Sequence, residues 1–405
     1  MDAVQDSVLN RAIGVFIMVD TQTVPAPARA PGGSLGQPWK DPKAVPFIKL
    51  EGVSKSYGDI LAVNRVDLSI HKGELFALLG ASGCGKSTLL RILAGLEVPT
   101  EGRVFIDGVD MAGMPPYRRP TNMMFQSYAL FPHMTVEQNI AFGLKQEQAP
   151  RARIVERVAA VLDLVQMGAF ARRKPHQLSG GQRQRVALAR SLVKEPKVLL
   201  LDEPLGALDK KLREQTQFEL VNIQERVGVT FVVVTHDQEE AMTMSSRIGV
   251  MNAGRIEQVG TPAEIYEYPH SRYVADFIGT ANLLEGIVQT HAADTVVVQC
   301  PDMPSAVAVS QVGAVPAGAS VTVMIRPEKM TMGRDRPTGE VNAAPGRVRD
   351  IAYLGDISIY HVQLDSGKVM EVAQTNLRHT AEQRVTWEDV VWVGWHPANA
   401  VVLTQ

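Results

Sequence analysis

The sequence predicts an α/β domain followed by a smaller all-β domain. The stretches "KVLLLDEP" (197–204) and "TFVVVTH" (230–236) are short apolar runs that end in polar groups, as buried parallel strands do. The stretch "STLLRILAGL" (87–96) has apolar residues at helical spacing and stops near Gly95. From about residue 281, short strand-like runs are separated by Gly, Pro, Asp and Ser, without long helical patterns. We expect this second part to be an OB-like barrel or sandwich.

The first 45 residues are expected to form a disordered leader. Residues 21–46 are rich in Pro, Ala and Gly, a composition that cannot bury much apolar surface. The short apolar run before them follows Asp2 and Asp6, whereas a signal peptide begins with basic residues. The sequence leaves open whether translation starts at Met1 or at Met18.

Regular structure is expected from residue 46 onward. The stretches "FIKLEGVSKSY" (47–57) and "NRVDLSIHKGELFALLG" (64–80) contain short alternating runs of apolar and polar residues, which predict strands. Residues 151–170 and 182–193 have helical patterns. This alternation of strands and helices favours an α/β domain.

Size and composition narrow the classes of protein. The 405 residues are too many for one ordinary core, so we expect an α/β domain at 46–280 and a β-rich domain at 281–405. The net charge is -2, so no basic excess favours nucleic acid or a lipid surface. Only two cysteines occur, Cys84 and Cys300, which excludes a disulfide framework and favours a reducing compartment. No apolar run reaches the length of about 18 residues that predicts a membrane span.

A phosphate-binding loop is the first motif with specific chemistry. "GASGCGKS" fits the pattern G-x-x-x-x-G-K-[ST], follows an apolar strand-like run and opens an apolar helix. Its glycines let the backbone wrap phosphates, Lys86 would neutralise the β- and γ-phosphates, Ser87 would ligate Mg²⁺, and Thr88 would add a phosphate contact. The alternative is a glycine-rich turn before a helix. The residues expected to contact the nucleotide here are Gly80, Ala81, Ser82, Gly83, Cys84, Gly85, Lys86, Ser87 and Thr88.

Two adjacent acids end the apolar run at 197–204. A P-loop nucleotidase needs an acid at such a strand end to hold Mg²⁺, usually through water, and Asp202 fits this role. Glu203 is placed to orient or deprotonate the attacking water. The alternative for such a pair is the solvated start of a loop.

Three further residues are candidates for the same site. His236, at the end of a strand-like run, could contact the γ-phosphate, and Gln126 could reach Mg²⁺ and the attacking water. Tyr57, ahead of the loop, could stack on a base. A structural histidine, a surface glutamine and a turn tyrosine are the alternatives. The guanine-reading motif N-K-x-D does not occur, so ATP is favoured over GTP.

The stretch "LSGGQRQRVALAR" (178–190) predicts a second anion site in the same chain. A serine and two glycines open this helix, and free N–H groups with the helix dipole favour an anion there. One chain with one phosphate loop therefore carries two candidate phosphate sites.

Taken together, these motifs occur in the order found in ATP-binding subunits of ABC transporters, and the resemblance covers roughly residues 46–280. It implies a sandwich of two such chains. The helix that the family's signature motif "LSGGQ" (178–182) opens, the signature helix, would complete the ATP site of the other chain. The residues that would face the partner's nucleotide are Ser179, Gly180, Gly181, Gln182 and Asp209. In the D-loop "GALD" (206–209), Gly206 stands where the family often has Ser.

A closer resemblance is to the ATP-binding subunits of spermidine/putrescine importers, and to those of putrescine importers most of all. It is carried by residues 115–146, by "HQLSGGQRQRVALARSL" and by "DIAYLGDISIYHVQLDSG", while "MIRPEKM" (324–330) resembles a segment of the importers' regulatory, TOBE-like β-domain. The resemblance implies hydrolysis of ATP with Mg²⁺ to energise polyamine import. The ATP-binding subunits of maltose, sulfate and ferric-ion importers share this arrangement of motifs and remain alternatives. A soluble ABC protein that does not act in transport is a further alternative.

The resemblance also implies partners and a location. These are a second copy of the chain, two transmembrane permease subunits and, indirectly, a periplasmic or extracellular polyamine-binding protein; no nucleic acid is expected. The chain would sit peripherally on the cytoplasmic face of the inner membrane. The segment after Gln126 resembles the surface that receives the permeases, so Phe125, Tyr128, Phe131 and Pro132 would shape a docking pocket. The alternative is that these side chains are buried in the core.

Overall fold

The described part of the chain begins at residue 37. The computed structural model describes residues 37–206, 208–292, 294–310, 315–339, 342–376 and 385–404. The chain divides into two units, 1–44 and 45–405. In the first unit the structure describes a 3₁₀ turn, η1 (Pro38–Lys40). The predicted disorder of residues 1–36 and the two possible starts, Met1 and Met18, lie outside the described residues. Within the described residues, no helix combines the length and the apolar character that crossing a membrane requires.

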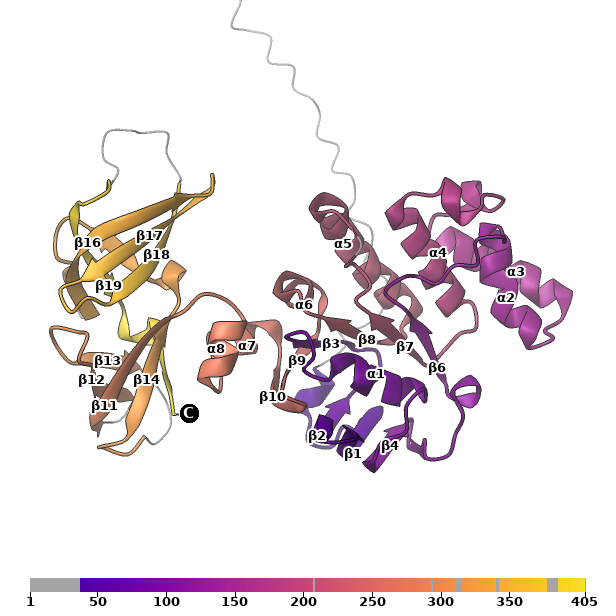
Figure 1. Ribbon diagram of the computed structural model, residues 1–405, viewed down its shortest axis with the longest axis horizontal. Helices are drawn as coiled ribbons and strands as arrows, with labels where there is room; N and C mark the ends of the chain where they lie inside the picture. Colours follow the sequence, from indigo (N-terminus) through magenta and orange to yellow (C-terminus); the bar gives the residue numbers. More distant parts are fainter. Residues whose placement is uncertain are drawn as a thin grey trace, which may run out of the picture. The chain divides into compact units, whose positions relative to one another are not determined.

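A six-stranded sheet lies at the centre of the α/β part (Figure 1). Its strands follow the order β10-β9-β3-β8-β7-β6. Their bounds are β3 (Leu75–Gly80), β6 (Thr121–Met124), β7 (Val198–Asp202), β8 (Thr230–Thr235), β9 (Arg247–Asn252) and β10 (Arg255–Gly260). All neighbours pair in parallel except β9 and β10, which are antiparallel. The carboxyl ends of β3, β7 and β8 therefore meet at one edge, as expected for the two apolar runs.

A smaller antiparallel sheet and one helix are formed by residues between 48 and 110, on either side of β3 in the sequence. The sheet has the order β2-β1-β4-β5, with β1 (Ile48–Tyr57), β2 (Ile60–Ile70), β4 (Glu101–Ile106) and β5 (Val109–Asp110). Helix α1 (Lys86–Ala94) ends where Gly95 takes a left-handed conformation, φ 77°. The N–H of Gly95 then donates to the carbonyls of Arg91 and Ile92, which caps the helix. This confirms the helix end expected from the sequence.

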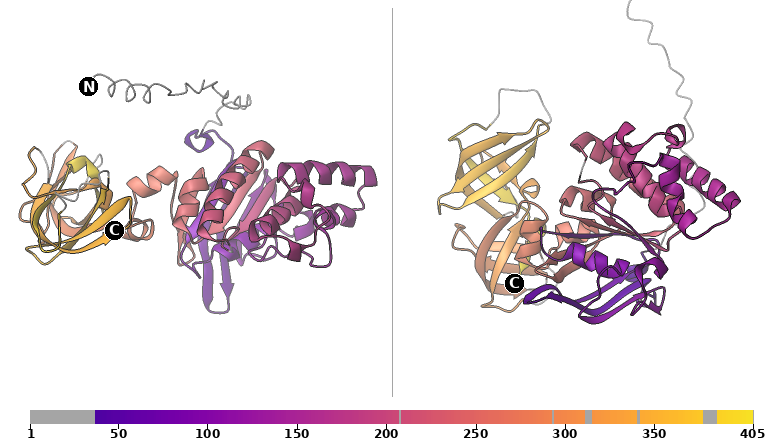
Figure 2. Two further views of the ribbon diagram at one scale, coloured as in Figure 1. Left: turned by 90° about the horizontal axis from the view of Figure 1, so that it is seen from above. Right: turned by 45° about the vertical axis from the view of Figure 1, so that its right-hand side comes forward.

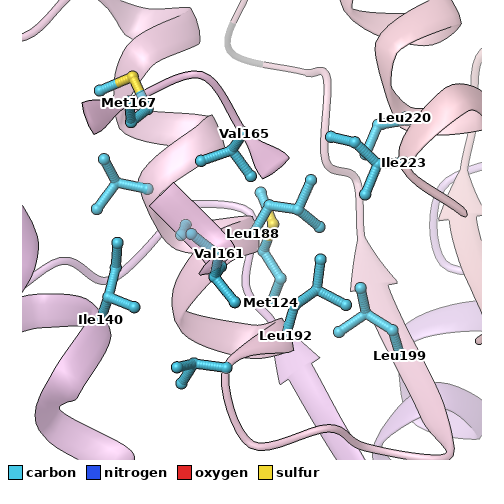
Figure 3. Packing of buried hydrophobic residues seen from close by; sticks show 14 of the residues in the cluster. Met124, Ile140, Val161, Val165, Met167, Leu188, Leu192, Leu199, Leu220 and Ile223 are labelled. Atoms are coloured by element: carbon cyan, nitrogen blue, oxygen red, sulfur yellow. The ribbon is translucent and has the colours of Figure 1, made fainter. Parts of the chain in front are cut away.

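Four longer helices share one apolar core with strands β6, β7 and β8. They are α2 (Val136–Gln146), α3 (Arg151–Leu164), α4 (Gly180–Leu192) and α5 (Lys210–Val227). Figure 3 shows part of the shared core, in which Ile140 of α2, Val161 of α3, and Leu188 and Leu192 of α4 belong to one buried cluster with Leu199 of β7. Burial of such side chains contributes about 1.5–3 kcal/mol each. The residues of α4 in this core all come from its C-terminal half, which is thereby held against the sheet: Val186, Ala187, Leu188, Ala189 and Leu192.

Two of the expected helices have different bounds. The helix expected at 151–170 stops at Leu164, because Gln166 adopts a left-handed φ of 56° and the N–H of Met167 turns back to the carbonyl of Leu162. A separate 3₁₀ turn, η3 (Gly168–Phe170), follows. The helix expected at 182–193 begins earlier, at Gly180, because the side chain of Ser179 caps it.

Three short helices pack against the β3 and β9 side of the sheet. They are α6 (Gln238–Met244), α7 (Pro262–Glu267) and α8 (Arg272–Phe277). Ala241 of α6, Ile265 of α7 and Val274 of α8 are buried in one cluster with Leu79 of β3. The helix that follows His236 is thereby packed against α7 and α8.

The C-terminal part consists of two five-stranded antiparallel sheets. The first has the order β13-β12-β11-β14-β20 and the second β15-β19-β16-β17-β18. Their strands are β11 (Asn282–Ala292), β12 (Thr295–Gln299), β13 (Val307–Ser310), β14 (Ser320–Ile325), β15 (Thr331–Gly333), β16 (Asn342–Tyr353), β17 (Ile357–Leu364), β18 (Val369–Thr375), β19 (Val390–Trp395) and β20 (Ala400–Leu403). Both sheets curl around a single apolar cluster (Figure 2). This confirms the all-β prediction; the exact domain limits remain a prediction.

Candidate nucleotide site

The glycine-rich loop connects β3 to α1 and leaves no room for a side chain at Gly80 or Gly85. A Cβ on Gly80 would lie 2.3 Å from the carbonyl oxygen of Met251. A Cβ on Gly85, whose φ is +106°, would lie 2.2 Å from the carbonyl oxygen of Ala62. The loop between them exposes Ala81, Ser82 and Gly83, whereas Cys84 is buried. Its backbone can therefore approach a phosphate closely, as the motif requires.

Lys86 points into this loop. It is 5% exposed, and its Nζ donates to the carbonyls of Gly80 and Ala81, both at 2.8 Å. The Sγ of Cys84 is 3.7 Å away. Neutral acceptors thus hold the ammonium group in the loop, and among the described residues no carboxylate forms an ion pair with it.

Ser87 and Asp202 meet across the site. The Oγ of Ser87, in the first turn of α1, donates to Oδ1 of Asp202 at the end of β7, at 3.2 Å. Burial raises the pKa of the Asp202 carboxyl, and the neighbouring Glu203 raises it further, against the opposing effects of Ser87, Arg91 and Lys86. Hydroxyl and carboxylate oxygens are the donors that Mg²⁺ prefers. The pair fits the predicted metal role, which stays a prediction.

Glu203 lies between two of the other predicted residues. Its Oε2 accepts from Nε2 of Gln126 at 2.8 Å, and its Oε1 lies 3.0 Å from Nδ1 of His236. The N–H of Glu203 donates to the carbonyl of Val234 on β8 at 2.9 Å. Glu203 also has a left-handed φ of 44°, a strained conformation for a non-glycine residue. The fold thus brings together three residues that are up to 110 positions apart in the sequence, from Gln126 to His236.

Tyr57 stands apart from these contacts. It is the last residue of β1, its side chain is exposed, and the ammonium of Lys55 lies 4.9 Å from its ring centroid. An exposed aromatic face is available for stacking on a base. The nucleotide contacts of Tyr57 and of Thr88, which is half-buried, remain predictions.

The second candidate anion site is a capped helix start. Ser179 Oγ accepts from the N–H of Gln182 at 3.3 Å, and Gln182 Oε1 accepts from the N–H of Ser179 at 3.0 Å. Asp209 caps α5 in the same way, since its Oδ1 accepts from the N–H of Leu212 at 3.0 Å. Gly181 is buried next to α5. A Cβ at Gly181 would lie 3.3 Å from the side chain of Leu212. Within the described residues, no hydrogen bond joins Ser179–Gln182 to the loop at 80–88.

Comparisons with known proteins agree with this geometry. Residues 63–206 match the family described as ABC transporter, and residues 323–403 match the TOBE domain. The putrescine transport ATP-binding protein PotG of Escherichia coli is 55% identical over 359 residues, which cover 89% of this chain and 95% of that protein. The chain belongs to the ABC transporter ATP-binding proteins.

Other relatives extend this finding. For the spermidine/putrescine import ATP-binding protein PotA of Thermobifida fusca, the identity is 51% over 365 residues, covering 89% of this chain and 94% of the relative. The solved structure of cbiO1 from Clostridium perfringens, described as part of the ABC transporter complex cbiONQ, is 32% identical, with a TM-score of 0.52 over 54% of this chain and 90% of that one. The predicted family and the predicted fold, an ABC-type P-loop domain followed by an OB-like all-β domain, are confirmed.

The four residues expected to receive the permeases of an ABC transporter divide into two kinds. Phe125 is 39% exposed, Pro132 is exposed and Phe131 is half-buried, so these three can contribute to a surface. Tyr128 is 7% exposed, lies in the core and donates from its OH to the carbonyl of Pro204 at 3.3 Å. For Tyr128 the alternative of a buried side chain was the right one.

Sequence reasoning missed a charged network beside His236. Arg213 of α5 donates from Nη1 to Oδ2 of Asp237 at 2.8 Å and from Nη2 to the carbonyl of Leu208 at 3.2 Å. Glu240, 2% exposed, accepts from Oγ1 of Thr235 at 2.7 Å, and burial raises the pKa of its carboxyl. The ion pair of Arg213 with Asp237 thereby links α5, the helix that follows the D-loop, to the residue after His236. Asp followed by Glu three positions later is a helix-start signal that could have pointed to Asp237, whereas nothing in the sequence marks Arg213.

Sequence reasoning also missed Arg190, near the end of the signature helix. Its guanidinium donates to the carbonyls of Tyr128 and Ala129 at 2.8 and 2.7 Å. These two residues have consecutive left-handed φ values of 62° and 44°, which are strained for residues with side chains. Arg190 therefore stabilises the strained segment that follows Gln126.

Proposed function

We propose that this chain is the subunit that hydrolyses ATP to energise import of a polyamine, putrescine or spermidine, through a membrane ABC transporter. The proposal is supported by two of its relatives, a putrescine transport and a spermidine/putrescine import ATP-binding protein. The single observation that carries the chemistry is the Glu203 carboxylate, held between Gln126 and His236 beside the phosphate loop.

The loop residues would bind the nucleotide. Lys86 would exchange its two carbonyl acceptors for oxygens of the β- and γ-phosphates, and the exposed ring of Tyr57 would stack on adenine. Ser87 and Asp202 would hold Mg²⁺, with Gln126 as a further oxygen donor. When bound, Mg²⁺ supplies positive charge to the phosphate oxygens.

Glu203 would act as the general base for the attacking water. A carboxylate oxygen has two lone pairs, so each oxygen of Glu203 can accept from water while it keeps its present neighbour. As water attacks the γ-phosphorus, Glu203 takes one of its protons and the bond to ADP breaks. Gln126 and His236 would orient the base and the water, since both already contact the carboxylate.

A second copy of the chain would complete each site. The capped start of α4 offers N–H groups to an anion, and its own chain joins it to the phosphate loop by no hydrogen bond among the described residues. We infer that Ser179, Gly180, Gly181 and Gln182 face the γ-phosphate held by the partner's loop, with Asp209 close by. Two ATP molecules would then lie between the two copies.

Import through a membrane also requires membrane-spanning partners. The chain would dock, through the surface around Phe125, Phe131 and Pro132, on two transmembrane permease subunits at the cytoplasmic face of the membrane. Substrate selection would belong to the permeases and to a polyamine-binding protein outside the cell.

Uptake of labelled putrescine in cells that lack only this chain tests the proposal. Uptake should be lost, and it should return with the wild-type chain but not with Glu203→Gln. Uptake of maltose, sulfate and ferric ion in the same cells serves as the control. Normal putrescine uptake together with loss of one of these would assign the chain to a different importer.

A further inference from the structure

Arg326 is a buried charge that joins the all-β domain to the nucleotide domain. It follows β14, is 1% exposed, and its Nη1 donates to the carbonyls of Ala275, Gly279 and Thr280 at 2.9, 2.9 and 3.0 Å. Its guanidinium also lies 4.3 Å from the ring centroid of Tyr266. All hydrogen bonds of this guanidinium within the described residues go to main-chain carbonyls. A buried cation costs free energy unless its donors are satisfied, so these carbonyls must keep their places.

Side chains next to Arg326 fasten the same segment to α7. The OH of Tyr266 donates to Oε1 of Glu328 at 2.7 Å, and Lys329 forms an ion pair with Glu267. Residues 326–329 are thus attached to α7 and to the end of α8 by side chains from both domains. Movement of this segment would carry the end of α8 with it.

Gln238 connects the end of α8 to the part of the chain that carries His236. Its Nε2 donates to the carbonyl of Phe277, the last residue of α8. Gln238 is also the first residue of α6, two positions after His236. Gln238 and Arg326 therefore hold carbonyls only two residues apart, those of Phe277 and Ala275.

We propose that Gln238 and Arg326 are positioning residues that make the contact between His236 and Glu203 depend on the all-β domain. Arg326 fixes the end of α8, the end of α8 fixes Gln238, and Gln238 fixes the backbone that carries His236. A ligand or protein that displaced residues 326–329 would change the 3.0 Å approach of Nδ1 to Oε1 without touching the nucleotide. The inference rests on the proposed ATP hydrolysis, since it names a regulation of that site.

The isosteric variant Gln238→Glu tests the first link. It keeps the size of the side chain but replaces the N–H donor with a carboxylate that faces the carbonyl of Phe277. We expect kcat for ATP hydrolysis by the full chain to fall about tenfold, with KM changed less than about twofold, because His236 acts after binding. The control is Glu239→Gln, the next residue of α6, whose side chain is exposed and which should keep wild-type kcat. A purely space-filling role for Gln238 predicts wild-type kcat in Gln238→Glu and would overturn the inference.

Arg326→Lys tests the second link with a milder change than removal of the charge. Nη1 and Nη2 of Arg326 together donate to four main-chain carbonyls, the fourth being that of Tyr266. Lysine keeps the charge but lacks this planar pair of donors, so kcat should again fall by about tenfold at unchanged KM. Arg334→Gln, which alters an exposed ion pair with Asp389 inside the all-β domain, is the control. Melting temperatures of all variants separate loss of folding from loss of turnover. If Arg326→Lys does not fold, hydrogen exchange of the α6 amides in Gln238→Glu replaces it, and unchanged exchange at α6 would contradict the link.

The double variant decides whether the two residues act along one path. Because both changes release the same helix end, the double variant should be no slower than the slower single variant, within about twofold. Effects that multiply would mean that the residues act independently and would overturn the coupling. A wild-type chain that does not hydrolyse ATP would refute the proposed function, whereas active wild type with unaffected variants refutes only this inference.

Discussion

His236 and Gln126 each occupy a different oxygen of the Glu203 carboxylate, with Nδ1 at 3.0 Å from Oε1 and Nε2 at 2.8 Å from Oε2. The carboxylate plane is therefore fixed from both sides. Its backbone is fixed as well, because the N–H of Glu203 donates to Val234 on the neighbouring strand. A base held in this way does not need to reorient when water arrives, which lowers the entropic cost of reaching the reactive geometry.

Glu203→Gln should bind MgATP and hydrolyse it very slowly. The amide keeps the shape of the side chain but cannot take a proton, and general bases typically contribute about 10²- to 10⁴-fold in rate. ATP should then accumulate in a stable dimer, which size exclusion would detect as a doubled mass. Hydrolysis near the wild-type rate would place the base elsewhere in the site.

Asp202→Asn should stabilise the protein while it removes Mg²⁺-dependent hydrolysis. The raised pKa of Asp202 means that the folded state binds the proton more tightly than the unfolded state, so the carboxylate destabilises the fold as pH rises above the ordinary Asp range. The neutral amide avoids this cost, and we expect the free energy of unfolding at pH 7 to increase. Denaturation without nucleotide at several pH values measures it.

The sign of the pH dependence makes this test specific. The difference between Asp202→Asn and wild type should shrink as pH falls through the raised pKa and vanish only below the ordinary value of 3.8, where both folded and unfolded wild type are protonated. A gain that stays constant over this range would show that the carboxylate is not the cause.

The residues at the ends of parallel strands were predictable because the sheet itself assembles them. Asp202, Glu203 and His236 each follow a short apolar run, and parallel strands place such positions at one edge. Contacts between helices carried no such signal. The burial of Tyr128, the ion pair of Arg213 with Asp237 and the attachment of Gln238 to α8 depend on how separate helices pack. The early end of α3 was missed because the left-handed φ of Gln166 leaves no mark in an apolar pattern.

Lys86→Ala should abolish ATP hydrolysis and transport without unfolding the chain. The lost contacts are with loop carbonyls that lie beside exposed residues, so water can replace the ammonium group as their donor. The free energy of unfolding should therefore change by about 1 kcal/mol or less, so the melting temperature should stay within a few degrees of wild type. Normal turnover in this variant would remove the nucleotide assignment of the loop.

Gly180→Asp tests whether the signature helix serves a second copy of the chain. Gly181 is the less suitable position, because any side chain there meets Leu212 at 3.3 Å within its own chain. At Gly180 a Cβ would lie 3.4 Å from Leu208, an ordinary contact, and a carboxylate at a helix start does not harm its own fold. Its charge would instead face the partner's γ-phosphate. Repulsion at about 4 Å is on the order of 4 kcal/mol at an effective dielectric near 20.

Hydrolysis by Gly180→Asp should accordingly fall about a hundredfold or more, while ATP affinity measured on dilute monomer should hardly change. The ATP-driven dimer of the Glu203→Gln background should be lost as well. Gly180→Ala adds a similar contact with Leu208 but no charge, and should retain most activity. The decisive measurement pairs nucleotide affinity at low protein concentration with hydrolysis at high concentration. If the monomer of Gly180→Asp loses ATP binding in step with hydrolysis, the signature helix acts on the phosphate loop of its own chain, and the sandwich of two copies is wrong.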